Sequence, residues 1–145
     1  MTTVVSAAVG AVVAALQTVP AVSTNIGRVR LRPWSAEQSS AVAVRPLSAD
    51  RGEAQLGFSG PDVWAVRIGV ECYARAAPGT SPDVAVDAVT QAVYTRLMSD
   101  PTLGGAVRGG LEPVSLSYDF DADAEQTACS VFTFTAHMVG SITFT

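Results

Sequence analysis

The sequence predicts an α+β fold, in which a mostly antiparallel sheet of four to five strands carries two helices packed on one face. Three observations indicate this fold: strict alternation over residues 64–75, a helix with a clear start and stop at 81–100, and two long closing strands at 111–120 and 128–138. No repeat, low-complexity tract or long linker divides the 145 residues, so we expect a single domain, 1–145.

The first apolar stretch, residues 2–19, predicts a helix buried against the sheet. Alanine and glycine fill much of the stretch, and the residues that recur at helical spacing are Val5, Val9, Val12, Val13 and Leu16. No Arg or Lys precedes the stretch, and it is shorter than the ~20 apolar residues of a membrane span. We therefore expect neither secretion nor insertion into a membrane.

Two short strands are predicted next, at residues 28–32 and 41–47. Pro46 indicates either the end of the second strand or a position at the sheet edge, because proline donates no ladder hydrogen bond. The polar, glycine-rich stretch 48–62 then predicts a mobile segment.

Residues 64–75 alternate between an apolar face and a mixed face, which predicts a strand with one face buried. The following helix begins with Ser81 as N-cap and Pro82 at its first position. Pro101 and the turn at Gly104 end it. The helical spacing predicts that one set of residues faces the sheet and a second set faces away. The inner set is Val86, Val89, Val93 and Leu97, and the outer set is Asp87, Thr90, Gln91 and Tyr94.

Alternation in the closing hairpin predicts an inward face on each strand. The inward residues are Val114, Leu116, Tyr118 and Phe120 on the first strand, and Phe132, Phe134, Ala136 and Met138 on the second. Residues 139–145 follow, and they favour a further edge strand within this subunit or on a neighbouring one.

The composition favours an oligomer. Hydrophobic residues make up 48% of the chain and charged residues only 15%, and the mean hydropathy is +0.31, which indicates more apolar surface than one core can bury. The net charge of -4 argues against general nucleic-acid binding. The two cysteines, Cys72 and Cys129, lack a CxxC spacing, so reduced thiols are expected rather than a disulfide.

No motif for catalysis or a cofactor is present in the sequence. His137 is the sole histidine, and Ala136 and Met138 flank it, without a Ser-His-Asp or Cys-His pattern. A phosphate-binding loop and zinc-ligand clusters are missing. We therefore expect a protein that is not an enzyme and carries no cofactor.

Alternating carboxylates mark the turn of the hairpin, at Asp119, Asp121, Asp123 and Glu125. A calcium loop would need glycine at Ala124 and a bidentate glutamate at Ser130, so the pattern fails as a calcium motif. A solvated turn is the simplest interpretation. A weak divalent site and an acidic contact with a subunit partner are the alternatives.

Arg28, Arg30 and Arg32 form a basic stripe on one face of a predicted strand. One interpretation is a solvated face that protects an edge strand from aggregation. The other is a contact surface, either for the acidic turn of a neighbouring subunit or for DNA passing through a ring lumen.

The order of these parts resembles the tail terminator (tail completion) proteins of long-tailed bacteriophages, typified by that of phage lambda. The resemblance rests on the Trp-led strand ending in ECYAR, the acidic-capped helix, the SDPTLGG stop and the closing hairpin, and it covers residues 28–138. No single motif among them is diagnostic, and the ordered combination carries the resemblance.

The resemblance implies a virion protein that forms a hexameric ring on the head-proximal end of the tail tube, assembled in the host cytoplasm. The implied partners are further copies of itself, the tail tube protein and the head–tail connector or neck protein. Two alternatives are another neck or head–tail joining protein, and a small α+β protein that binds an apolar ligand beneath the helix 81–100.

Overall fold

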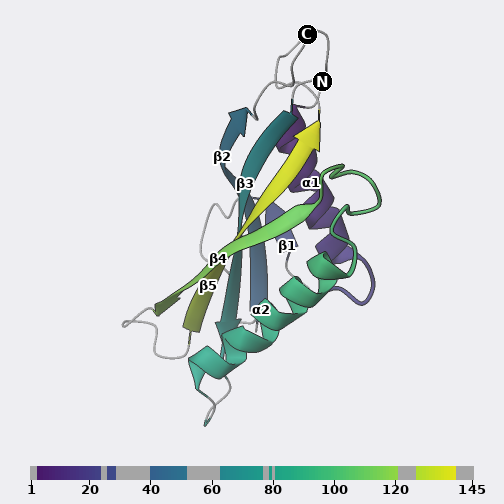
Figure 1. Ribbon diagram of the computed structural model, residues 1–145. Helices are drawn as coiled ribbons and strands as arrows, with labels where there is room; N and C mark the ends of the chain where they lie inside the picture. Colours follow the sequence, from purple (N-terminus) through teal and green to yellow (C-terminus); the bar gives the residue numbers. More distant parts are fainter. Residues whose placement is uncertain are drawn as a thin grey trace, which may run out of the picture.

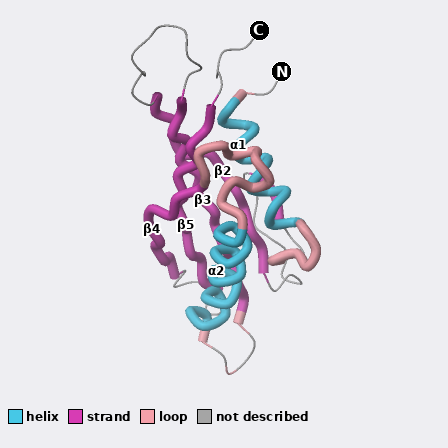
Figure 2. Tube along the Cα trace, turned by 45° about the vertical axis from the view of Figure 1, so that its right-hand side comes forward, coloured by secondary structure: helices cyan, strands magenta, loops and turns pink. Residues whose placement is uncertain are grey.

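A five-stranded sheet with both helices on one face forms the molecule (Figure 1). The computed structural model describes residues 3–23, 26–28, 40–51, 63–76, 79, 81–120 and 127–139. The strand order is β1-β2-β3-β5-β4; β1 runs parallel to β2, and every other neighbouring pair is antiparallel. The predicted α+β class and mostly antiparallel sheet are confirmed, and Figure 2 shows the two helices on the same side of the strands from a second direction.

Helix α1 (Val4–Gln17) is the predicted buried first helix. Thr3 caps its start, because its hydroxyl accepts a hydrogen bond from the Ser6 amide at 3.1 Å. Its end is held by Arg96 of the second helix, whose guanidinium donates to the carbonyl oxygens of Ala15 at 3.1 Å and Thr18 at 2.6 Å. These bonds satisfy carbonyls that a helix end leaves without partners. The buried side of α1 consists of Val4, Ala8, Val9, Val12 and Leu16.

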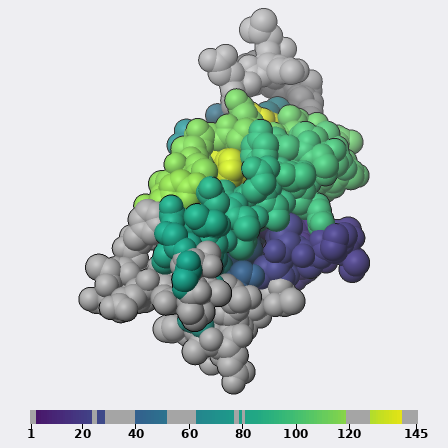
Figure 3. Space-filling view, turned by 90° about the horizontal axis from the view of Figure 1, so that it is seen from below, coloured from purple at the N-terminus to yellow at the C-terminus, as the bar shows by residue number. Residues whose placement is uncertain are grey.

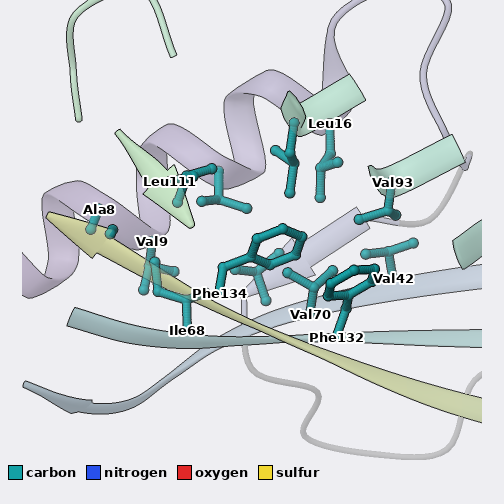
Figure 4. Close-up of a cluster of buried hydrophobic side chains, with 14 of the residues drawn as sticks. Ala8, Val9, Leu16, Val42, Ile68, Val70, Val93, Leu111, Phe132 and Phe134 are labelled. Carbon is teal, nitrogen blue, oxygen red and sulfur yellow. The ribbon is translucent and has the colours of Figure 1, made fainter. Parts of the chain in front are cut away.

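The two long central strands, β3 (Val63–Arg75) and β5 (Thr127–Val139), pair along their full length, from Val63 opposite Val139 to Arg75 opposite Thr127. Their helix-facing side chains form the centre of the core, where Phe132 and Phe134 stack with ring centroids 4.5 Å apart (Figure 4). The predicted inward face of β5 is confirmed, since its four members are all buried.

Helix α2 (Pro82–Ser99) begins at the predicted N-cap Ser81 and packs across β3 and β5. The Ser81 hydroxyl hydrogen-bonds the Asp83 carboxylate, which lowers the pKa of Asp83. Beyond the helix, the Asp100 carboxylate accepts a bond from the Gly104 amide at 2.8 Å. Gly104 and Gly105 have φ of 71° and 93°, so the predicted glycine turn is confirmed.

One assignment on α2 is wrong: Thr90, predicted to face away from the sheet, is buried. Its hydroxyl donates to the Val86 carbonyl at 2.8 Å and lies 2.6 Å from the Ser130 hydroxyl of β5. A threonine satisfied in this way can occupy the inner stripe of a helix, which apolar spacing alone does not reveal.

Strand β2 (Ser40–Arg51) is longer than predicted, and β1 (Ile26–Arg28) begins earlier. Proline does not end β2, which continues to pair with β3 beyond it. Because β1 pairs only with Val42–Val44, Pro46 lies on an unpaired edge of β2, which confirms the second interpretation of this proline. A register shift after Pro46 accommodates the ring. The predicted mobile segment therefore loses residues 48–51 to β2, and residues 52–62 and 29–32 lie outside the described residues.

The prediction for β4 (Leu111–Phe120) fails in its burial. Val114, Leu116 and Tyr118 are 45%, 39% and 43% exposed. Leu116 and Tyr118 stand opposite Phe132 and Ser130 and so share the helix-facing side, but α2 packs on β3 and β5 and does not cover β4. The described backbone confirms the hairpin itself, while the Phe120 side chain and residues 121–126 and 140–145 lie outside the description.

Truncation of Phe134 is expected to lower the free energy of unfolding by about 3–5 kcal/mol, because its ring is fully buried at the centre of the core. Urea denaturation of Phe134→Ala measures this loss. Val84→Ala is the control: Val84 is 60% exposed, so the same truncation is expected to cost less than about 0.5 kcal/mol. Equal losses in the two variants would contradict the arrangement of the core.

Candidate functional site

The predicted basic stripe is described only at Arg28, the last residue of β1. Its guanidinium turns onto α1, where it donates to the Ser6 carbonyl at 3.2 Å and the Ser6 hydroxyl at 2.9 Å. Arg28 therefore ties the edge strand to a helix while staying solvent-exposed. Arg30 and Arg32 lie outside the described residues, and their role as a contact surface stays a prediction.

The predicted acidic turn is described only through the backbone of Asp119, which stands opposite Cys129 in the β4–β5 ladder. The side chain of Asp119 and both Asp121 and Asp123 lie outside the described residues. In the part of the chain that is described, no group of acidic, histidine and cysteine residues is arranged to hold a metal ion.

The described ends of the two charged segments lie on opposite edge strands of the sheet. Arg28 ends β1 and Asp119 lies in β4, and strands β2, β3 and β5 separate them. Four interstrand spacings of about 4.8 Å give roughly 19 Å between the edge strands. The structure therefore places Arg28 and the backbone of Asp119 far apart within one subunit.

A groove between α2 and β4 is the feature that the sequence did not predict. It has a volume of about 360 Å³. Figure 3 shows yellow atoms of β5 at the surface between the light green of β4 and the teal of α2. The residues that line it are Asp87, Ala88, Thr90, Gln91, Tyr94, Leu116, Tyr118 and Phe132.

Aromatic side chains form the walls and the floor of this groove. Tyr94 stacks on Phe132 with ring centroids 5.6 Å apart, and the Tyr118 hydroxyl donates to the Asp87 carboxylate at 2.8 Å. This bond raises the pKa of Tyr118, because the carboxylate accepts from the neutral phenol. The alternation of β4 predicts which of its side chains face the helices, but not whether a helix covers them. The prediction of burial therefore missed this half-open apolar wall.

Beneath the groove, Cys72 of β3 lies beside the bonded hydroxyls of Thr90 and Ser130. Burial raises the pKa of Cys72 to about 12, so the thiol stays protonated at neutral pH and is a poor nucleophile. Cys72 stands opposite Ser130 and Cys129 opposite Tyr73, which places the two thiols on opposite faces of the sheet. No disulfide joins them, as predicted.

His137 lies on the face of the sheet away from the helices, opposite Ala65. Its Nε2 is 3.0 Å from Oε2 of Glu112, and both side chains are exposed. Farther along the same face, Glu71 accepts from the Tyr73 hydroxyl at 3.2 Å and pairs with Arg45 at 3.3 Å. These contacts satisfy charges on an open sheet surface.

Comparison with known proteins identifies the fold. No family model and no curated protein sequence matches the chain. Among solved structures, the chain is similar to one chain of the virion of a native gene transfer agent particle, with a TM-score of 0.53 and 17% sequence identity. The similarity covers 90% of this chain and 93% of that one. At this identity the likeness establishes a shared fold along nearly the whole chain.

None of the described helices is both long enough and apolar enough to cross a bilayer.

The two cysteines are expected to differ strongly in reactivity. At pH 8 the half-buried Cys129 should react with Ellman's reagent, whereas Cys72 should react only on unfolding, because its raised pKa and its burial suppress the thiolate. Absorbance at 412 nm with and without urea measures this difference. A Cys129→Ser variant with a rapidly reacting thiol in its folded state would contradict the placement of Cys72.

Proposed function

We propose that the chain is a virion structural protein that forms a ring on the head-proximal end of a phage tail tube. The observation that carries this proposal is the fold likeness along 90% of the chain to a component of a phage-like virion particle. The ordered parts that resemble tail terminator proteins point in the same direction. The coarser role, a virion structural protein, depends on the likeness alone, and the terminator role depends on both.

The charges at the sheet edges support a head-to-tail ring. A closed ring of identical subunits uses a heterologous interface, in which one flank of each subunit complements the other flank of its neighbour. In the sequence, arginines mark the segment that follows β1 and carboxylates mark the segment that follows β4, and β1 and β4 are the two edge strands of the sheet. Patches of opposite sign steer association and fix its register.

Tube capping then has a simple physical meaning in this proposal. The ring occupies the surface on which the next tube subunit would assemble, and its other face receives the head–tail connector or neck protein. DNA passes through the lumen during injection. The protein acts without catalysis, in the host cytoplasm during assembly and in the virion afterwards.

Two alternatives have different support. Another neck or head–tail joining protein would have the same fold likeness, and gene order would separate the two, since a terminator gene normally lies just before the tail tube gene. An apolar-ligand-binding protein would use the groove beside α2. Val86, Val93 and Leu97 are fully buried between α2 and the sheet, so the groove lies at the edge of the helix instead of beneath it.

The ring is tested by native mass spectrometry and negative-stain electron microscopy of the purified chain over a concentration series. Closed rings with a central hole are expected, and six subunits are expected from the resemblance. Parallel series with and without magnesium test whether the acidic turn responds to a divalent ion. Discrete open dimers or a stable monomer that copurifies with a small ligand would contradict the ring.

Charge reversal tests the electrostatic flank. The double variant Arg30→Glu, Arg32→Glu is expected to weaken ring formation, because it places carboxylates against the acidic turn of the neighbour. Sedimentation velocity at low and high salt measures the effect, which salt should reduce. Arg108→Glu, on the exposed loop after α2, is the control that reverses a single charge outside this segment. Identical assembly in all three proteins would remove the arginines from the interface.

A further inference from the structure

Exposed hydrophobic side chains of the described chain gather around the groove between α2 and β4. Among the described residues, seven large hydrophobic side chains are exposed. Four of the seven lie on β4 or on the groove wall of α2: Tyr94, Val114, Leu116 and Tyr118. Soluble proteins rarely leave such residues clustered unless the cluster meets a partner. The feature to explain is therefore what covers this cluster.

The outer edge of β4 accompanies the groove. β4 is last in the strand order, and no described strand pairs with its second edge. Pro113 and a register shift interrupt the first part of the strand, while Ser115 to Phe120 keep a regular ladder with β5. An added strand would hydrogen-bond to this regular part and place alternate side chains in the groove.

The geometry points to segment 140–145 of a second copy of this chain as that added strand. Its sequence, GSITFT, alternates Ile142 and Phe144 with Ser141, Thr143 and Thr145, and β-branched and aromatic residues predominate. Two apolar side chains two residues apart match the spacing of Leu116 and Tyr118 on β4. None of its side chains carries a charge that burial beside the groove would leave unpaired.

The chain cannot fill its own groove with this segment. Seven strand residues separate Val139, where β5 ends, from Phe132 in the groove, a distance of about 23 Å. Phe144 follows Val139 by five residues, and five residues span at most about 18 Å when fully extended. The same segment of a neighbouring subunit is not limited by this distance. The inference deepens the proposed ring, since it names the contact that would join adjacent copies.

Two complementary variants test the contact. Leu116→Arg damages the groove, and a chain that ends at Val139 lacks the segment. Each is expected to raise the concentration needed for assembly by about tenfold or more, because buried apolar side chains are lost from the interface. The control is Val84→Arg, which makes an equally drastic change on an exposed part of α2 outside the groove. This variant should assemble normally. Circular dichroism confirms that each variant is folded.

Mixing the two defective chains gives a sharper result. The Leu116→Arg chain still has a segment to donate, and the truncated chain still has a groove to accept it. The mixture should therefore form one-to-one dimers that stop growing, while each chain alone stays monomeric at the same concentration. Native mass spectrometry distinguishes the two masses. Unchanged rings from either variant alone would overturn the inference and leave the ring proposal intact.

Disulfide trapping tests the pairing even if rings need a tail tube to form. Ser117 and Thr143 each alternate with the groove-facing residues of their segments, so both belong on the opposite face of the added strand pair. In a Cys129→Ser background, Ser117→Cys and Thr143→Cys chains should oxidise to a mixed dimer. Thr95→Cys, exposed on α2, should not cross-link with Thr143→Cys. No mixed dimer at up to about 1 mM protein would overturn the inference. A mixed dimer without rings would support it while contradicting the proposed ring.

Discussion

The packing of α2 across β3 and β5 is the constraint on which the rest of the structure depends. The inner side of the helix is apolar except for Thr90, and the bond between the Thr90 and Ser130 hydroxyls fixes the helix at one position over β5. At the far end of α2, Arg96 binds the carbonyls that end α1, so the position of one helix sets that of the other. The two helices together cover β2, β3 and β5 and leave β4 at the open edge.

This incomplete cover gives the two edges of the sheet different properties. At the β1 edge, α1 lies against the strand, and Arg28 bonds to the helix backbone. At the β4 edge, aromatic and aliphatic side chains face the helix layer but reach beyond it. A subunit with two unlike edges suits a head-to-tail contact, because a symmetric dimer would bring identical edges together. The same asymmetry explains the high apolar content of the sequence without a larger core.

Sequence patterns predicted the fold well where burial and periodicity agree. Residues of β3 and β5 alternate cleanly because one face meets both helices, and the α2 boundaries follow from Ser81, Pro82 and Pro101. The β4 prediction failed because alternation reports which face a side chain points to, and not whether a helix covers it. Thr90 was misplaced for a related reason, since its bond to Ser130 depends on a residue 40 positions away. The groove combines both limits and therefore had no separate signal in the sequence.

An exposed edge strand normally invites uncontrolled pairing, and β4 carries features that restrict it. Pro113 lacks an amide donor, and the register shift that follows bends the first part of the strand away from regular pairing. The Tyr118–Asp87 bond holds one groove wall to the helix, so an incoming strand meets a shaped surface with a polar limit. A short segment with apolar side chains two residues apart would match both the regular part of the edge and the spacing of Leu116 and Tyr118. These features favour a specific partner over open-ended aggregation.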